Sequence, residues 1–274
     1  MSRNSHNMDS LRHGIVQRLQ SLQRAGVEQI PHVEQDLTPR NQTITETSSS
    51  APQEINPDLP SADHTSTTST YTIAPSETSN NDRISALEII RHDVMGCTRC
   101  GELARTRTQT VFGIGNPNPR ICFLGEAPGA DEDRQGEPFV GRAGKLLTDI
   151  IQKGMGLRRE DIFILNVLKC RPPGNRNPLP EEVENCRGFF EHQLAVLQPE
   201  IICCLGAVAA QNLLQTTEPI GRLRGRFHVY RGIKVLATYH PAYLLRNPSA
   251  KKNTWEDIQL LMQELGLPLP DKKI

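Results

Sequence analysis

Residues 121–147 read ICFLGEAPGADEDRQGEPFVGRAGKLL, and this stretch decides the fold. Its first four residues are apolar, as in a buried strand, and a helix is expected from about Arg142. A buried strand that runs through a Gly-rich loop into a helix is how open α/β sheets form a site at the carboxyl ends of their strands. Glu126 follows the strand, and Phe139 lies further along the same loop. A carboxylate and an aromatic ring on one loop indicate acid or electrostatic chemistry beside a stacking surface.

Further apolar strand segments follow, and helical segments separate them. We expect strands at residues 121–124, 162–166, 201–205 and 233–237, and helices at residues 142–153, 180–197, 207–214 and 253–265. Residues 111–118 are expected to form a turn-rich loop. Apolar strands that alternate with helices favour a parallel sheet covered on both faces. The sequence therefore predicts an α/β fold over residues 82–267: a three-layer α/β/α sandwich with a central, mainly parallel four-stranded sheet.

Residues 1–80 differ in composition from the rest of the chain. They hold five Lys and Arg against nine Asp and Glu, whereas residues 81–274 hold 26 against 22. Eight of the twelve residues at positions 61–72 are Ser or Thr, and too few apolar residues are present to offset the entropy of ordering the segment. We predict an acidic, mostly disordered leader over residues 1–80, with a short helix at residues 10–26.

The composition also bears on the compartment and the partner. No run of about 18 apolar residues is present, and the N-terminus lacks the apolar core of a signal peptide, so no membrane partner is expected. Seven cysteines, four of them in one spaced pattern, favour a reducing interior over a secreted disulfide framework. The basic excess after residue 80 fits an anionic partner, and an ordinary solvated surface would also explain it.

Four cysteines have the spacing of a metal site. Cys97 and Cys100 form a CxxC pair, and Cys170 and Cys186 follow in loop or helix-start positions. Such a set predicts a metal site with four cysteine ligands, and the spacing does not separate zinc from an iron–sulfur cluster. The remaining cysteines lie in strand patterns and are expected to be small buried side chains: Cys122, Cys203 and Cys204.

Two further polar residues follow predicted strands. Asn166 ends the strand at residues 162–166, and His240 comes shortly after the strand at residues 233–237. Because the carboxyl ends of parallel strands meet at one edge of a sheet, we expect both to lie near Glu126. Each has a structural alternative: Asn166 as a turn or cap residue, His240 as a structural histidine, and Glu126 as a helix cap or ion-pair partner. Phe139 taken alone is equally typical of a core residue.

Several motifs in order resemble one known family. The segments GEAPGADED (125–133) and GEPFVGRAGKLL (136–147) are similar to motif A of the family 4 uracil-DNA glycosylases, the iron–sulfur branch of that superfamily. NVLKCRPPGNRNP (166–178) and HPAYLLR (240–246) extend the resemblance, which covers roughly residues 84–265. It implies that the four spaced cysteines, Cys97, Cys100, Cys170 and Cys186, hold a structural 4Fe-4S cluster.

The resemblance also implies how DNA and base are bound. The base is extruded from the stack and Phe139 clamps its face. The amide of Asn166 offers a donor and an acceptor side by side, complementary to O4 and N3–H of uracil. The segment after the histidine enters the duplex and fills the gap, a role expected for Leu244, Leu245 and Arg246.

The chemistry implied by the resemblance is hydrolysis of the N-glycosidic bond. Negative charge that grows on uracil O2 is stabilised by His240 and by the backbone of the turn from Gly125 to Ala127. Positive charge grows on the sugar, where Glu126 stabilises it and orients or activates water. We expect a monomer that acts on uracil-containing DNA, single- or double-stranded, in a bacterial-type cytoplasm in association with the nucleoid.

Two other classes of protein remain open at this point. One is a DNA-binding or damage-sensing module without turnover, which would keep the basic surface and the cysteine site. The other is a nucleotide or acyl hydrolase on the same kind of sheet. The arginines around the second cysteine pair stay ambiguous between phosphate contacts and solvated surface: Arg171, Arg176 and Arg187.

Overall fold

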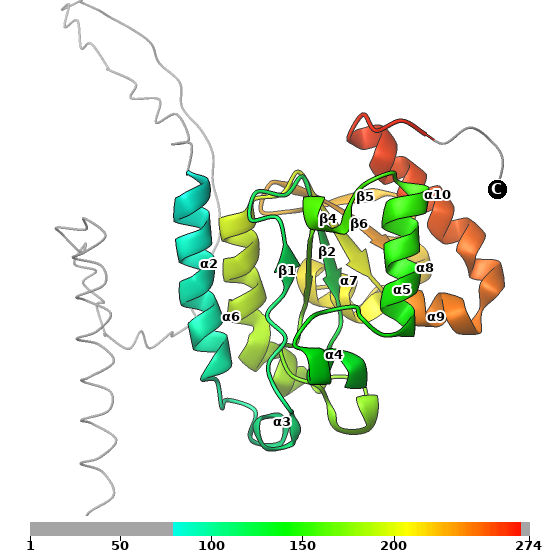
Figure 1. Ribbon diagram of the computed structural model, residues 1–274. Coiled ribbons are helices and arrows are strands. Elements are labelled where there is room, and N and C mark those ends of the chain that lie inside the picture. Colours follow the sequence, from blue (N-terminus) through cyan, green and yellow to red (C-terminus); the bar gives the residue numbers. More distant parts are fainter. Residues whose placement is uncertain (1–78, 270–274) are drawn as a thin grey trace, which may run out of the picture. The chain divides into compact units, whose positions relative to one another are not determined.

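The computed structural model describes residues 79–269. The described chain begins with helix α2, Asn80–Met95, and its last helix is α10, Lys251–Glu264 (Figure 1). The helix predicted at residues 10–26 and nearly all of the leader predicted at residues 1–80 lie outside the described residues. The predicted division of the chain into a leader and a domain at residues 82–267 therefore stays a prediction.

One mixed sheet forms the centre of the described chain. The strand order is β1-β3-β2-β4-β6-β5, and the four inner strands are parallel to one another. Their bounds agree with the predicted segments: β2 Ile121–Gly125, β3 Phe163–Asn166, β4 Ile201–Leu205 and β6 Ile233–Thr238. The prediction of an α/β fold around a mainly parallel sheet is confirmed.

The prediction of four strands was too low, because the sheet has six. β1, Ile114–Gly115, pairs antiparallel with β3, and β5, Phe227–Tyr230, pairs antiparallel with β6. β1 is two residues long inside the expected turn-rich loop, and β5 is an edge strand with no fully buried residue, so neither shows a buried apolar run. Arg231 and Gly232, with φ of 47° and 83°, join β5 to β6 in a tight turn.

The sheet buries a separate apolar core on each face. Alternate strand residues such as Leu124, Leu165 and Cys204 pack against α2 and against helices α6, Pro180–Leu197, and α7, Ala207–Leu214. The intervening residues, such as Phe123 and Ile164, pack against α5, Arg142–Asp149, and α10. Figure 1 shows α2 and α6 on one side of the sheet and α5 and α10 on the other. The predicted three-layer sandwich is therefore confirmed.

The remaining helices are short, and most occupy the loops at the sheet edge. They are α3 Gly101–Thr106, α4 Ala130–Gln135, α8 Ile220–Leu223 and α9 Pro241–Arg246. The helix predicted at residues 142–153 is α5 followed by a π-helical turn, Ile150–Gly154. None of the helices within residues 79–269 combines the length and apolarity needed to cross a bilayer.

The parallel strands bring the predicted polar residues to one edge. Gly125, the last residue of β2, is the register partner of Asn166, the last residue of β3. Leu205 at the end of β4 is likewise the partner of Thr238 at the end of β6. Glu126 and His240 follow these strand ends directly or after one residue, so the fold gathers them where open α/β sheets place ligands.

Candidate active site at the carboxyl edge of the sheet

A cavity of about 410 Å³ opens at this edge. It brings together five residues that the sequence singled out: Glu126, Ala127, Phe139, Asn166 and His240. Arg246 and Arg176, both named from the sequence, also line it, together with residues that the sequence analysis did not select: Pro128, Gly129, Glu132, Ala143, Pro172, Asn175, Asn177, Ala242 and Tyr243. Three strand ends and one long loop thus meet around a single space.

Gly125 keeps this space open by having no side chain. A Cβ atom on Gly125 would lie 2.3 Å from Asn166 Oδ1 and 2.6 Å from the Phe139 ring. Any larger residue would therefore push into the amide or the ring. The glycine lets the amide and the aromatic ring approach the same strand end from two sides.

Asn166 presents an acceptor without a partner. The residue is 2% exposed, and its Oδ1 accepts no hydrogen bond within residues 79–269. A buried polar atom of this kind costs free energy unless a ligand supplies the missing hydrogen bond. The lining of the cavity by Asn166 shows where such a ligand would lie. A turn or cap role does not account for this amide, because its oxygen contacts no backbone N–H of the described chain.

The Phe139 ring is held by its own loop. Phe139 has φ of 54°, a left-handed conformation that a bulky residue adopts only when its surroundings impose it. Glu132 accepts hydrogen bonds from the next two backbone N–H groups, Val140 and Gly141, at 3.0 Å each. Arg159 donates to the Phe139 carbonyl at 3.1 Å, and Gly144 leaves room for that carbonyl on α5. The ring is thus a fixed wall of the cavity.

His240 is a neutral imidazole in this site. Burial lowers its pKa to about 4, and the nearby Arg246 lowers it as well. Its Nδ1 accepts a hydrogen bond from the Ala242 backbone N–H at 3.1 Å and so caps α9. A neutral ring whose Nδ1 is an acceptor carries its proton on Nε2. The ring therefore offers a single N–H donor, and its centroid lies 5.6 Å from that of Phe139.

Glu126 is a half-buried carboxyl on the cavity wall. Burial raises its pKa above the ordinary glutamate value. Its backbone carbonyl accepts from the Leu168 N–H at 3.0 Å, which ties the start of the loop to the segment after β3. Its side chain makes no hydrogen bond or ion pair with another residue of the described chain. Within these residues it is therefore neither a helix cap nor an ion-pair partner. A raised pKa in a cavity is typical of a carboxyl that takes part in chemistry.

The residues expected to contact DNA after His240 fall into two groups. Leu244 is 1% exposed and belongs to the protein interior, so it is not placed to contact DNA in this structure. Leu245 is 44% exposed and Arg246 is exposed on the cavity rim. The helical turn of α9 separates the two leucines, a distinction that the sequence pattern HPAYLLR did not show.

The four spaced cysteines converge away from the cavity. Cys97 and Cys100 lie between α2 and α3, Cys170 follows β3, and Cys186 lies in α6. Burial raises the pKa of the Cys170 thiol, Arg107 opposes the rise, and nearby Cys97 and Cys100 add to it. Burial raises the pKa of Cys186 to about 11, with Cys170 and Cys100 among the nearby groups that contribute. All four cysteines belong to, or pack against, the same hydrophobic cluster of the core.

Hydrogen-bond donors face two of these sulfurs. Arg107 donates to Cys170 Sγ at 3.1 Å, and Asn185 donates to Cys100 Sγ at 3.7 Å. None of the four is in a disulfide. Within residues 79–269 no group of three or more His, Cys, Asp or Glu is arranged to hold one metal ion. The remaining cysteines, Cys122, Cys203 and Cys204, are fully buried in strands, as predicted.

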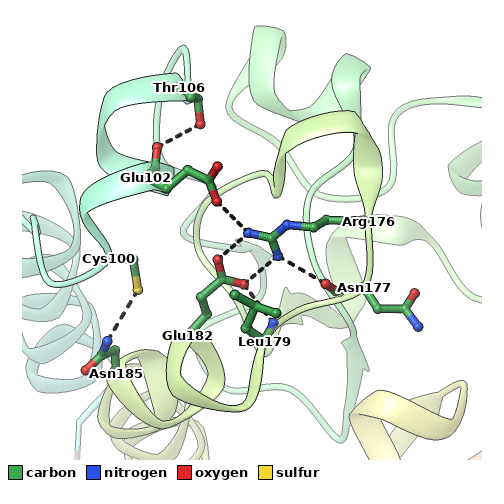
Figure 2. A network of polar contacts seen from close by, with 8 residues as sticks. All are labelled: Cys100, Glu102, Thr106, Arg176, Asn177, Leu179, Glu182 and Asn185. Atoms are coloured by element: carbon green, nitrogen blue, oxygen red, sulfur yellow. Dashed lines mark hydrogen bonds and ion pairs between the residues drawn. The ribbon is translucent and has the colours of Figure 1, made fainter.

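Arg176 connects the helix after Cys100 to the helix that carries Cys186, as Figure 2 shows. Its guanidinium donates to both carboxylate oxygens of Glu182 at 2.7 and 2.9 Å and to Glu102 at 2.8 Å. Glu182 also accepts from the Leu179 N–H at 2.8 Å at the start of α6. Arg176 itself lines the cavity. Arg176 is thus an ion-pair residue whose side chain stays partly exposed, and its contact with phosphate stays a prediction.

The other two ambiguous arginines also have protein partners. Arg171 donates to Asn175 Oδ1 at 2.7 Å, which helps to fold the same cavity wall. Arg187 pairs with Glu184 at 2.9 Å and lies over the Phe190 ring, away from the cavity. Sequence reasoning did not predict that Pro172, Asn175 and Asn177 line the cavity, because they lie in a Pro- and Asn-rich loop without a periodic pattern. A short connection between two metal-site cysteines was the one signal that this loop must stay close to them.

Comparisons with known proteins agree with this geometry. A sequence model of the Uracil DNA glycosylase superfamily matches residues 112–259. The type-4 uracil-DNA glycosylase of Archaeoglobus fulgidus is 43% identical over 193 residues, 68% of this chain and 96% of that protein. The type-4 uracil-DNA glycosylase of Thermotoga maritima is 45% identical over 63% of this chain and 91% of that protein. A type-5 uracil-DNA glycosylase of Thermus thermophilus is 29% identical over 55% of this chain and 77% of that protein.

Proposed function

Because the chain belongs to the uracil DNA glycosylase superfamily, and within it to the type-4 uracil-DNA glycosylases, we infer that it removes uracil from DNA by hydrolysing the N-glycosidic bond. The observation that carries this function is the cavity in which the unpartnered Asn166 Oδ1 lies beside Phe139 and His240. We expect the enzyme to act as a monomer on single- or double-stranded DNA that contains uracil, leaving an abasic site for base excision repair.

The base enters the cavity after it leaves the DNA stack. Phe139 covers one face of the ring, and its imposed backbone conformation keeps it there before DNA binds. Asn166 Oδ1 accepts from uracil N3–H, and its Nδ2 donates to O4. The missing hydrogen bond at Oδ1 supports this assignment.

Two groups act on the charges that develop as the bond breaks. The Nε2–H of neutral His240 donates to uracil O2, where negative charge grows, and the backbone around Ala127 lies on the same cavity wall. Glu126 stabilises the positive charge on the sugar and orients the attacking water. Gly125 leaves room for the Asn166 amide and the Phe139 ring, which bind the base. Leu245 and Arg246 contact the DNA beside the cavity, whereas buried Leu244 supports the helix that carries them.

We propose that the cysteine centre holds a 4Fe-4S cluster, which the similarity to type-4 uracil-DNA glycosylases supports. The four cysteines belong to, or pack against, one hydrophobic cluster, and hydrogen-bond donors face two of their sulfurs, which suits thiolate ligands of an iron–sulfur cluster. Cys97, Cys100, Cys170 and Cys186 would hold the cluster, which would supply a structural cross-link. Purified protein should be brown, with roughly four iron and four sulfide per chain; colourless protein with one zinc would contradict this.

The function is tested with a labelled single strand that contains one uracil. Incubation with the protein should give an alkali-labile abasic site at that position, and the same strand with thymine should stay intact. A damage-sensing module would bind the uracil strand without making the abasic site. A nucleotide or acyl hydrolase would leave the strand unchanged and consume a free small substrate, so either result would refute the glycosylase.

A further inference from the structure

A pair of tyrosines adjoins the cavity and has no part in the chemistry above. Tyr243 lines the cavity and is 40% exposed. Its ring stacks on that of Tyr239, with centroids 5.1 Å apart and planes 25° from parallel. Tyr239 directly precedes His240. The stacked pair is thus fixed next to the group that faces the base.

A buried ion pair supports this stack from inside the protein. The Arg224 guanidinium lies 5.6 Å from the Tyr239 ring centroid. Arg224 donates to both carboxylate oxygens of Asp257 at 3.0 Å each, and Thr238 donates to the same carboxylate at 2.6 Å. Asp257 is 0% exposed, so moving Arg224 would leave a buried charge unpaired. Tyr239 therefore has a rigid backing, and Tyr243 rests on Tyr239.

We propose that the Tyr243 ring is a stacking surface for the nucleobase adjacent to the uracil in the DNA strand. The proposal rests on the proposed function, because a uracil that leaves the stack uncovers the face of its neighbour. An exposed aromatic ring replaces that lost stacking, and it accepts any base because every base has a π face. Arg246 lies on the same helix and rim, where its charge suits the adjoining phosphate.

The structure favours a base over an apolar partner for this surface. Tyr243 is part of the cavity wall, so a strand with its uracil in the cavity brings the neighbouring nucleotide to the rim. Its ring is ordered before DNA binds, so little side-chain entropy is lost on stacking. Such stacking contributes roughly fivefold to a hundredfold in affinity per base.

The test uses a strand in which 2′-fluoro-2′-deoxyuridine, which resists hydrolysis, has 2-aminopurine as its neighbour on the 5′ or the 3′ side. Extrusion of the uracil releases 2-aminopurine fluorescence, and stacking on Tyr243 suppresses it again. Wild type and Tyr243→Phe should give low fluorescence in the complex with one of the two strands. Tyr243→Leu should give high fluorescence and bind roughly fivefold to a hundredfold more weakly. Tyr230→Leu, on strand β5 and outside the cavity lining, is the matched control and should behave as wild type.

Equal fluorescence and affinity for wild type and Tyr243→Leu would overturn the proposal. All proteins are also assayed on the cleavable uracil strand, which separates the two inferences. If the wild type excises uracil normally but wild type and Tyr243→Leu give equal 2-aminopurine signals, only the stacking proposal is refuted. If the wild type does not excise uracil, the proposed function is refuted. Tyr239→Leu keeps the Tyr243 ring and removes its backing, so it should lose part of the quenching. If Tyr243→Leu is unstable, Tyr239→Leu replaces it as the test variant. Quenching by Tyr239→Leu identical to that by wild type would then refute the proposal.

Discussion

At the scale of single residues, Asn166 carries the sharpest test of base recognition. In the proposed complex its amide would donate to uracil O4 and accept from N3–H, whereas cytosine presents a donor at N4 and an acceptor at N3. Asn166→Asp sets a carboxylate against O4 in a site that is 2% exposed, so uracil excision should fall by roughly ten-thousandfold. An Asp that keeps one proton accepts from cytosine N4 and donates to N3, so relative preference should shift toward cytosine.

The measurement for Asn166 is single-turnover excision of uracil and of cytosine, each opposite guanine and in a single strand. Asn175→Asp is a matched control, because Asn175 lines the same cavity but bonds to Arg171. It should retain most uracil excision. If Asn166→Asp cuts uracil at the wild-type rate, the unpartnered amide oxygen is not the base reader.

The pH dependence of the reaction should separate His240 from an ordinary histidine. Burial places the pKa of His240 at about 4, so the ring is neutral well below the usual histidine pKa. The unfolded chain binds this proton more readily, so the contribution of His240 to stability is complete above about pH 6.5 and is lost as pH falls toward 4. The proposed role of Glu126 requires the ionised carboxylate, and burial raises its pKa, so the single-turnover rate should fall on acidification through a pKa above the ordinary glutamate value.

A pH–rate profile from pH 4 to 9 checks this assignment. The acid limb should disappear or shift in Glu126→Gln, whose residual rate is on the order of a hundred- to a thousandfold lower. No inflection is expected near pH 6.5. An inflection there that vanishes in His240→Asn would show that the imidazole titrates at its ordinary pKa and is not held neutral.

The location of a candidate site residue could be predicted from the sequence where the residue lies at the end of a strand. Asn166 ends a strand, and Glu126 and His240 closely follow strand ends, which parallel pairing brings together whatever the loops do. Leu244 and Leu245 were not separable, because only the observed helix α9 decides which of two adjacent leucines faces inward. Glu132 was missed because its role is to bind backbone N–H groups eight and nine residues away, which leaves no periodic pattern.

At the scale of elements, the wall between Cys170 and α6 depends on one arginine. Arg176→Ala removes the donors to Glu182 and Glu102 shown in Figure 2 and should loosen the loop at residues 172–177. A misplacement of about 1 Å at a reacting site can cost on the order of a hundredfold in rate, so single-turnover excision should fall ten- to a hundredfold. Arg176→Lys should recover only part of the loss, since an ammonium keeps the charge but lacks the planar fork that binds Glu182 and Glu102 together.

The control for Arg176 is Arg187→Ala, which removes an arginine with its own ion pair outside the cavity lining. Hydrogen exchange of residues 172–178 should rise in Arg176→Ala and stay unchanged in Arg187→Ala. Visible absorbance of the cysteine centre, measured on the same samples, reports whether that centre is intact. Equal excision rates in the two variants would show that Arg176 only stabilises the fold.

Elements were predictable in proportion to the apolar surface they bury. The four inner strands and helices α6 and α7 have buried, periodic residues, and their bounds were predicted to within about a residue. β5 escaped notice because an edge strand of partly buried residues lacks an apolar run. The π-helical turn after α5 was also unforeseen, since its Ile150 and Ile151 continue an ordinary helical pattern.

At the scale of the whole molecule, the first helix cap of the described chain lies at the boundary predicted between leader and catalytic domain. Ser79 accepts a hydrogen bond from the Asp82 N–H at 3.2 Å, and Asp82 accepts from the Ser79 N–H at 3.3 Å, a reciprocal cap at the start of α2. Arg83 then donates to the last carbonyls of α6, Val196 and Leu197, at 2.9 and 2.7 Å. The first residues of the described chain are therefore already part of its packing.

Two truncations that differ by two residues test this boundary and the role of the leader. Removal of residues 1–78 keeps Ser79, so excision should stay within about twofold of the full chain because the composition of the leader lacks core-forming residues. Removal of residues 1–80 deletes the cap, which should lower the free energy of unfolding by about 1 kcal/mol while the excision rate is kept. Both are measured by denaturant unfolding and by single-turnover excision beside the full chain. If the shorter truncation lost excision with its unfolding curve unchanged, the leader would contribute to the site, and the catalytic domain would have to be extended toward the N-terminus.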